Sequence, residues 1–188
     1  CDSIIDRFDD DETHTTAVAA MVAIGHLPPL LEALSSPNQH TRKGALAAVK
    51  RLANPDAIPA LQSAMEGAEV DEREKIVRAF GSIGLEAHSH LFAALSDSEK
   101  GVQLAALQGL ALDRSEALMM KLISMAEHPD PDVRLAAVDA MQRFSDGRVV
   151  VPLAAALEDV DARVARQARR SLDHLESVVA RKDTSSDQ

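Results

Sequence analysis

The chain repeats itself at intervals of 30 or 31 residues. The repeated string reads Val or Thr, Arg, any residue, Ala, Ala or Leu, two further residues, Ala or Val, and a large apolar residue. Its second position falls at residues 42, 73, 103, 134 and 165. Prolines keep the same interval, since Pro28, Pro59 and Pro152 stand one period and then three periods apart. Two markers with one period indicate an array of copies, each of which buries its apolar face against its neighbours.

The composition of the copies is typical of helical hairpins. Hydrophobic residues make up 46% of the chain, yet the only aromatic residues are four Phe, so the core is built from Ala, Leu, Val, Ile and Met. Such residues favour closely packed helices, and no segment alternates as a strand does. We therefore predict an all-α fold, an α-solenoid (superhelix) of about five and a half hairpins. The array spans residues 13–181, after an acidic arm at residues 1–12 and before a polar tail at residues 182–188 that frays.

The repeated strings resemble the HEAT-like repeats first noted in phycobilisome lyase subunits. The resemblance covers about residues 13 to 180 and extends from the string at Thr41–Leu52 to the one at Val164–Leu172. It implies stacked hairpins, in a family whose members serve as scaffolds, chaperone-like subunits and a few enzymes. Two copies depart from the pattern, with Gln103 and Ala165 in place of Arg. One enzymatic branch, the deoxyhypusine hydroxylases, binds iron through His-Glu dipeptides; this sequence contains none, so that activity is not expected.

The same resemblance implies which side chains face a partner, because in HEAT-like arrays the second helix of each pair lines the concave face. Steps of four along the variable positions of each second helix stay on one stripe. The polar candidates for partner binding on this stripe are Lys43, Arg51, Glu74, Arg78, Gln108, Asp139, Arg143, Arg166, Arg170 and His174. Six of them are basic and two acidic, whereas the whole chain has a net charge of −10. This contrast predicts a groove for an acidic partner segment, since Arg binds carboxylates well.

Two other interpretations of the stripe remain open. Long basic side chains also line solvated faces and shield apolar seams without binding anything. Alternatively, the acidic run at residues 9–12 neutralises the groove in its own chain or in a neighbouring one.

Motifs for catalysis are absent from the sequence. It has no Gly-rich phosphate loop, Cys-x-x-Cys, His-Glu-x-x-His or Gly-x-Ser-x-Gly, and His88 and His90 are two residues apart, which points them to different faces of a helix. We expect neither a cofactor nor a metal. The acidic balance and the lack of Trp and Tyr argue against nucleic acid as a partner. We predict a noncatalytic protein–protein interaction scaffold; the alternative, on resemblance alone, is a maturation or lyase-type chaperone subunit acting on a cofactor-bearing protein.

The first residues leave the cellular location open. Cys1 fits a mature bacterial lipoprotein, whose lipidated cysteine would anchor the chain to the cell envelope. The alternative is a piece of a longer chain, for which we favour a cytoplasmic location, with membrane contact expected only if Cys1 is lipidated. The segment Thr13–Ile24 is apolar almost all round and has no partner helix before it in the repeat register. We therefore expect this end to dock on another subunit or to continue into further sequence.

Overall fold

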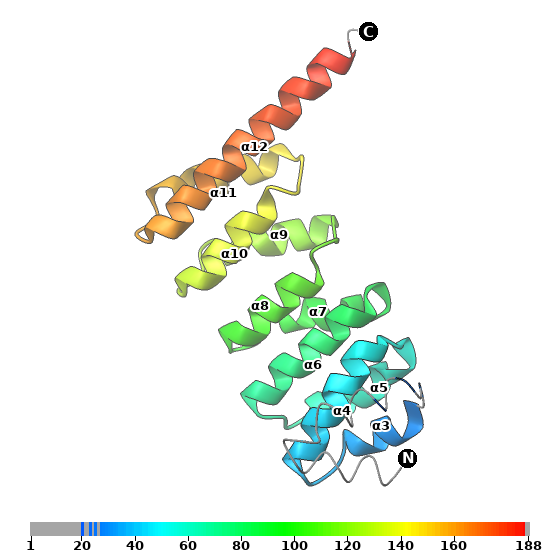
Figure 1. Cartoon of the computed structure of the whole chain (residues 1–188). Helices are drawn as coiled ribbons and strands as arrows, with labels where there is room; N and C mark the ends of the chain where they lie inside the picture. The colour runs from blue at the N-terminus through cyan, green and yellow to red at the C-terminus, as the bar shows by residue number, and fades with distance from the viewer. Residues whose placement is uncertain (1–19, 21–22, 24, 26, 187–188) are drawn as a thin grey trace. The chain divides into compact units, whose positions relative to one another are not determined.

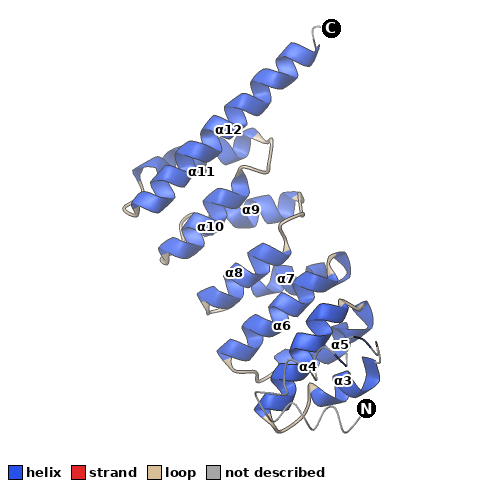
Figure 2. Ribbon diagram, viewed as in Figure 1, coloured by secondary structure: helices blue, strands red, loops and turns tan. Residues whose placement is uncertain are grey.

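The computed structural model describes the backbone of residues 20, 23, 25 and 27–186. Within these residues every regular element is helical, so the all-α repeat fold predicted from the sequence is confirmed (Figure 2). Cys1, the acidic arm and most of the helix expected at Thr13–Ile24 lie outside the described residues. The chain divides into two compact units, residues 1–110 (unit 1) and residues 111–188 (unit 2).

The described residues of unit 1 form three helical hairpins. The helices of these hairpins, taken in pairs, are α3 (Leu27–Ala33) with α4 (Gln39–Leu52), α5 (Ile58–Met65) with α6 (Val70–Ile83), and α7 (His88–Ala94) with α8 (Lys100–Gly109). Short 3-10 turns lead into α5 and α7, at Pro55–Ala57 and Leu85–Ala87.

Unit 2 contains two hairpins. They pair α9 (Glu116–Met125) with α10 (Pro131–Met141), and α11 (Val150–Ala155) with α12 (Ala162–Ser186). Two 3-10 turns flank α11, at Gly147–Val149 before it and at Ala156–Glu158 after it.

The second helices of the hairpins form a layer of their own in each unit. In unit 1, α4 packs on α6 and α6 on α8; in unit 2, α10 packs on α12. The first helices lie behind them in the view of Figure 1. We call the side formed by α4, α6, α8, α10 and α12 the second-helix layer. The seam between the two rows of helices is closed by aliphatic residues with no exposed area, including Leu61, Ile76, Val77, Leu118 and Val138. Ala at many of these core positions lets the helices approach closely.

Polar caps fix where two of the second helices, α4 and α10, begin. The Asn38 side chain accepts a hydrogen bond of 2.8 Å from the His40 amide at the start of α4. The Asp130 side chain accepts one of 2.9 Å from the Asp132 amide at the start of α10, where Pro131 is the first helical residue. These contacts satisfy amides that the helix leaves unpaired.

One helix end differs from the sequence prediction. α12 continues to Ser186, past residue 181, where the array was predicted to end. The chain contains no Gly or Pro after Pro152, so no residue of the tail interrupts the helix. α8 ends at Gly109 and α10 at Met141, where the chain turns toward the next hairpin.

Candidate binding surface on the second-helix layer

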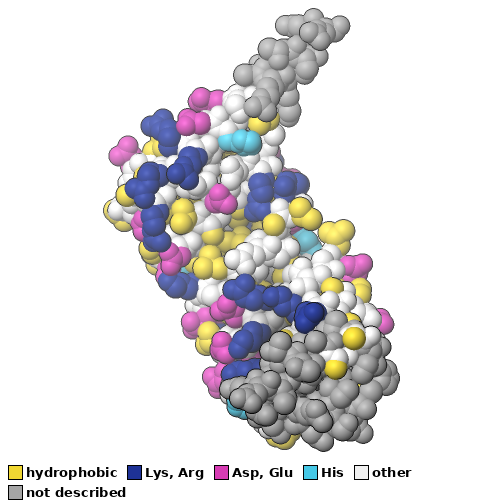
Figure 3. All heavy atoms as spheres, viewed as in Figure 1, with side chains coloured by type: hydrophobic (Ala, Val, Ile, Leu, Met, Phe, Trp, Pro, Cys, Tyr) yellow, Lys and Arg dark blue, Asp and Glu magenta, His cyan; other side chains and the backbone are white. Residues whose placement is uncertain are grey.

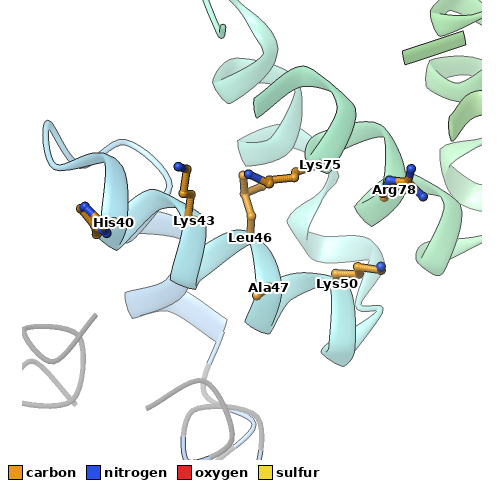
Figure 4. Close-up of a pocket in the computed structure, with 7 residues that line it drawn as sticks. All are labelled: His40, Lys43, Leu46, Ala47, Lys50, Lys75 and Arg78. Atoms are coloured by element: carbon orange, nitrogen blue, oxygen red, sulfur yellow. The ribbon is translucent and has the colours of Figure 1, made fainter. Parts of the chain in front are cut away.

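A hollow of about 640 Å³ lies on the second-helix layer of unit 1, between α4 and α6. We call it the basic groove. Figure 4 shows the side chains that line it, which are His40, Lys43, Leu46, Ala47 and Lys50 of α4 with Lys75 and Arg78 of α6. Four of the seven are permanently cationic near neutral pH, and none is acidic. Leu46 is buried and gives the groove an apolar floor.

The helical register explains which residues of α4 enter the basic groove. Residues 43, 47 and 50 follow the spacing of four and then three that keeps an α-helical stripe on one side. The predicted stripe took a second step of four to Arg51, and each such step advances about 40° beyond a full turn. Arg51 is exposed and is not part of the lining, whereas its neighbour Lys50 is.

Intramolecular partners neutralise the two cations that α6 contributes. Lys75 Nζ lies 2.6 Å from Asp71 Oδ2. Arg78 Nη2 lies 2.7 Å from Glu74 Oε1, and its Nη1 donates to Gln108 Oε1 at 3.0 Å. Glu74 and Gln108, both predicted as partner-binding residues, therefore hold Arg78 in place.

The two lysines of α4 are different. Among the described residues, no carboxylate lies within ion-pair distance of Lys43 or Lys50. Lys43 interacts with Asp71 by its charge, without an ion pair. The hydrogen bond from Lys75 lowers the pKa of Asp71, and the nearby charge of Lys43 lowers it further. Within the described residues, Lys43 and Lys50 are thus the cations of the basic groove that form no ion pair.

A smaller hollow of about 170 Å³ adjoins the basic groove, because Lys50 and Arg78 line both. Gly81 of α6 and Gly109 of α8 line this hollow. Their backbones lie close together, since a Cβ added to Gly109 would lie 3.0 Å from the Gly81 Cα. Gln108 also lines the hollow. Four of the predicted residues, Lys43, Glu74, Arg78 and Gln108, therefore lie in or next to one surface in unit 1.

Unit 2 does not gather its predicted residues in the same way. Asp139 Oδ1 accepts hydrogen bonds from Gln142 and from Gln167 of α12, at 2.9 and 2.8 Å. The Arg166, Arg170 and His174 side chains of α12 are exposed, and Arg143 lines a separate hollow that includes none of the other predicted residues. Figure 3 shows Lys and Arg side chains on the second-helix layer of each unit.

Three arginines at the repeat positions, Arg42, Arg73 and Arg134, have a structural role that the sequence analysis did not assign. We call each of them an arginine fork. In the third, Arg134 Nη1 donates to the carbonyls of His128 and Pro129, in the loop before its own helix. Its Nε and Nη2 each donate to Asp159 of the next hairpin at 2.8 Å, a bidentate pair. The hydrogen bonds from Arg134 lower the pKa of Asp159.

The other two forks lie within unit 1. Arg73 binds the Ala68 carbonyl and Asp97, as Arg134 binds His128 and Asp159. Arg42 binds the Ser36 carbonyl but takes its acid, Glu72, from the first turn of α6 instead of the loop before it. The signal in the sequence for the Arg73 and Arg134 forks was an acid recurring in step with the arginine, since Asp97 and Asp159 are two periods apart.

Gln103, which stands in the place of the fork arginine in its copy, keeps the bond to the loop before its own helix and lacks the bond to an acid of the next hairpin among the described residues. Gln103 Nε2 donates to the Asp97 carbonyl at 2.7 Å, so it still closes the loop before its own helix. Its Oε1 is buried and has no hydrogen-bond partner among the described residues. A neutral amide cannot form the charged fork.

The repeat geometry agrees with the comparison to known families. The family model for HEAT repeats matches residues 3–86 and 89–173. This chain belongs to the HEAT repeat family. The resemblance seen in the Arg-containing strings is therefore confirmed, and it extends over nearly the whole sequence.

Solved structures with the same fold include natural and designed repeat proteins. A designed armadillo repeat protein in complex with the peptide (KR)4 is 16% identical, with a TM-score of 0.61 over 92% of this chain and 98% of that one. The archaeal HEAT-like repeats protein from Thermococcus onnurineus is 14% identical, with a TM-score of 0.57 over 94% and 87%. The phycocyanin lyase complex of CpcE and CpcF from a Nostoc species gives 19% identity and a TM-score of 0.48 over 94% and 81%.

No curated protein sequence matches this HEAT repeat chain. In the part of the chain with assigned positions, no helix is long and apolar enough to cross a bilayer, and no three His, Cys, Asp or Glu side chains come together as metal ligands would. The fold is that of a repeat scaffold suited to protein binding and typical of noncatalytic binding proteins.

Proposed function

We propose that this HEAT repeat chain is a noncatalytic interaction scaffold that binds an acidic segment of a partner protein in the basic groove. The observation that supports the proposal is the positive charge of the basic groove. None of the described residues that line it is an acid, although the chain as a whole has a net charge of −10. Cations collected on one hollow of an acidic protein attract an acidic segment and repel a basic one.

The two lysines of α4 define the part of the groove expected to contribute most. Lys75 and Arg78 already have carboxylate partners, so a ligand gains less from them. Lys43 and Lys50 form no ion pair with the described residues that binding would break. The floor at Leu46 and Ala47 accepts an apolar side chain between two acids. An acidic segment with one aliphatic residue fits this combination of charge and floor.

The designed armadillo repeat protein binds a peptide whose charge is opposite to that expected for the partner of this chain. Its structure holds the peptide (KR)4, which is an alternating basic chain. The lysines of the basic groove would repel that peptide. We therefore expect this scaffold to select peptides of the opposite charge.

Fluorescence anisotropy with two labelled peptides tests the proposal. One peptide alternates Glu and Ser around a central Leu, and the other is (KR)4. The wild-type chain is expected to bind the acidic peptide, with an affinity that falls as salt rises, and not to bind (KR)4. Lys50→Glu is expected to weaken binding by about tenfold, which corresponds to about 1.4 kcal/mol.

Arg51→Glu is the matched control. Lys50 and Arg51 are adjacent in the last turn of α4, so both reversals change the charge equally and both lose the same favourable interaction with the helix dipole. Only Lys50 lines the groove. Equal losses from the two variants would mean a long-range charge effect without a site, and tighter binding of duplex DNA than of the acidic peptide would replace the proposal with a nucleic-acid function.

A further inference from the structure

Two arginines of unit 2 converge on one backbone oxygen. Arg143, at the end of α10, donates from Nη1 to the Ala111 carbonyl at 2.5 Å and from Nε to the Ala140 carbonyl at 3.0 Å. Arg114 donates from Nη1 to the same Ala111 carbonyl and to the Asp113 carbonyl, both at 2.9 Å. Two like charges are thus held together by neutral acceptors.

This arrangement leaves several N–H groups of the two guanidiniums without a protein acceptor in the described part of the chain. A guanidinium has five N–H donors, and among the described residues Arg114 donates from one nitrogen and Arg143 from two. Within the described residues, no carboxylate lies at ion-pair distance from Arg114 or Arg143. Burial, and then the charge of Arg114, lowers the pKa of Arg143. A cation in this position is destabilised unless an anion joins it.

Both arginines line a hollow of about 410 Å³. We call it the arginine pocket. Met119 and Phe144 form its apolar wall, and the Ser145 hydroxyl is a further donor. The volume is ample for a phosphate or carboxylate group with a short stem.

The acids around the arginine pocket are already engaged. Glu116 and Asp146 both pair with Arg148, which also lines the hollow. Asp113 accepts from the Ser115 amide and hydroxyl at 2.6 and 2.9 Å. Asp139 is held by Gln142 and Gln167. These carboxylates lower the net positive charge of the region, so the expected affinity is modest.

We infer that the arginine pocket is a binding site for a small oxyanion, a phosphate or carboxylate group, gripped by Arg114 and Arg143. The anion supplies the acceptors that the shared Ala111 carbonyl cannot, and planar guanidinium forks suit both groups. The site lies wholly within unit 2 and does not rest on the basic groove.

Isothermal titration calorimetry of the full chain with inorganic phosphate and, separately, with succinate tests the site. We expect saturable binding in the millimolar range with one of the two ions. Tighter phosphate binding assigns the site to phosphate groups, and tighter succinate binding assigns it to carboxylates. Absence of saturable binding for both ions overturns the inference.

Three variants locate the anion. Arg114→Gln and Arg143→Gln are each expected to weaken binding by about tenfold. Arg114 is exposed, so its variant keeps the test valid even if Arg143→Gln unfolds. Glu116→Gln removes a negative charge and releases Arg148, so it is expected to tighten binding.

Arg170→Gln is the matched control, because it removes one exposed arginine of the same unit that is not part of the pocket lining. It is expected to change the affinity by less than about twofold. An equal loss from Arg170→Gln and Arg114→Gln would mean that the anion follows overall charge and would overturn the site.

Discussion

The second-helix layers of unit 1 and unit 2 both carry basic residues, and particular residues of each are held differently. In unit 1, Lys43 and Lys50 project into a hollow without an ion-pair partner among the described residues. In unit 2, Arg134 is a fork to Asp159 and Arg163 pairs with Asp132 and Asp161. These two lysines of unit 1 are thus available to a ligand, whereas these two arginines of unit 2 are engaged by acids of their own unit.

This difference teaches that counting charges along a stripe does not locate a binding surface. Six basic residues were predicted on one face, but their availability depends on whether a carboxylate of the same helix or of a neighbouring repeat lies at ion-pair distance. Arg78 is held by Glu74, while Lys50 is not held in the described part of the chain. The following predictions test the distinction between charges that hold the fold and charges that are available to a partner.

The largest effect is expected from breaking an arginine fork. Arg134→Met leaves Asp159 as a charge with 9% exposure and no guanidinium, and frees two loop carbonyls. We expect the free energy of unfolding to fall by about 3 kcal/mol. Urea titration followed by circular dichroism measures this, since the chain has no Trp or Tyr for fluorescence.

Arg163→Met is the control for this prediction. Its ion pairs to Asp132 and Asp161 are exposed to solvent, so little change in the unfolding midpoint is expected. If the two variants lost stability equally, the fork would have no special structural role.

The second prediction concerns acid. Arg134 lowers the folded-state pKa of Asp159 below its value in the unfolded chain, which is about 3.9. Its contribution is therefore fully present above about pH 4 and is lost as the pH falls through the folded pKa. The stability gap between wild type and Arg134→Met should narrow from pH 5 to pH 3, and a gap that widens toward acid would contradict the assignment.

The third prediction addresses the close helix approach found in unit 1. A Cβ on Gly109 would lie 2.8 Å from Leu91 Cδ2 and 3.0 Å from the Gly81 backbone. Gly109→Ala is therefore expected to cost about 1 to 2 kcal/mol despite better helix propensity. Gly101→Ala in the same helix meets only the movable end of Glu74, so thermal unfolding should show it neutral or stabilised.

The smallest effect separates two lysines of one groove. Lys43→Ala should weaken acidic-peptide binding by several fold, because no carboxylate of the described residues lies at ion-pair distance from Lys43. Lys75→Ala should weaken it by less than about twofold, since Asp71 already neutralises Lys75. Anisotropy titrations of the two variants compare them directly, and a reversed order would mean that internal ion pairs do not decide availability.

Most of the architecture could be predicted from the sequence because it depends on periodicity. The interval between Arg42 and Arg134 sets the hairpin length, and the family match and the helical pairs confirm it. Helix ends were harder to predict. α8 stops at Gly109 where the chain turns, whereas α12 has no Gly or Pro to stop it and continues to Ser186.

The candidate surface could be predicted only in part. Lys43 and Arg78 were named in advance and share one hollow, but Lys50 and Lys75 were missed because steps of four drift around a helix of 3.6 residues per turn. The arginine pocket could not be predicted, since it depends on Arg143 and Arg114 meeting at one carbonyl across a hairpin. A sequence gives no sign of such a shared acceptor.

The arginine fork has an evolutionary consequence. In each fork the arginine belongs to one copy and the acid to the next. A duplicated copy therefore brings with it both an arginine and an acid that can form forks with its neighbours. An array of this kind can lengthen or shorten by whole copies without new contacts having to be invented. Gln103 and His128 stand in register positions that hold Arg and Asp elsewhere in the chain. A copy that carries both fork residues and is added at that point would leave its own acid and its own arginine without a fork partner, so we expect copies to be gained or lost more readily where a fork is complete.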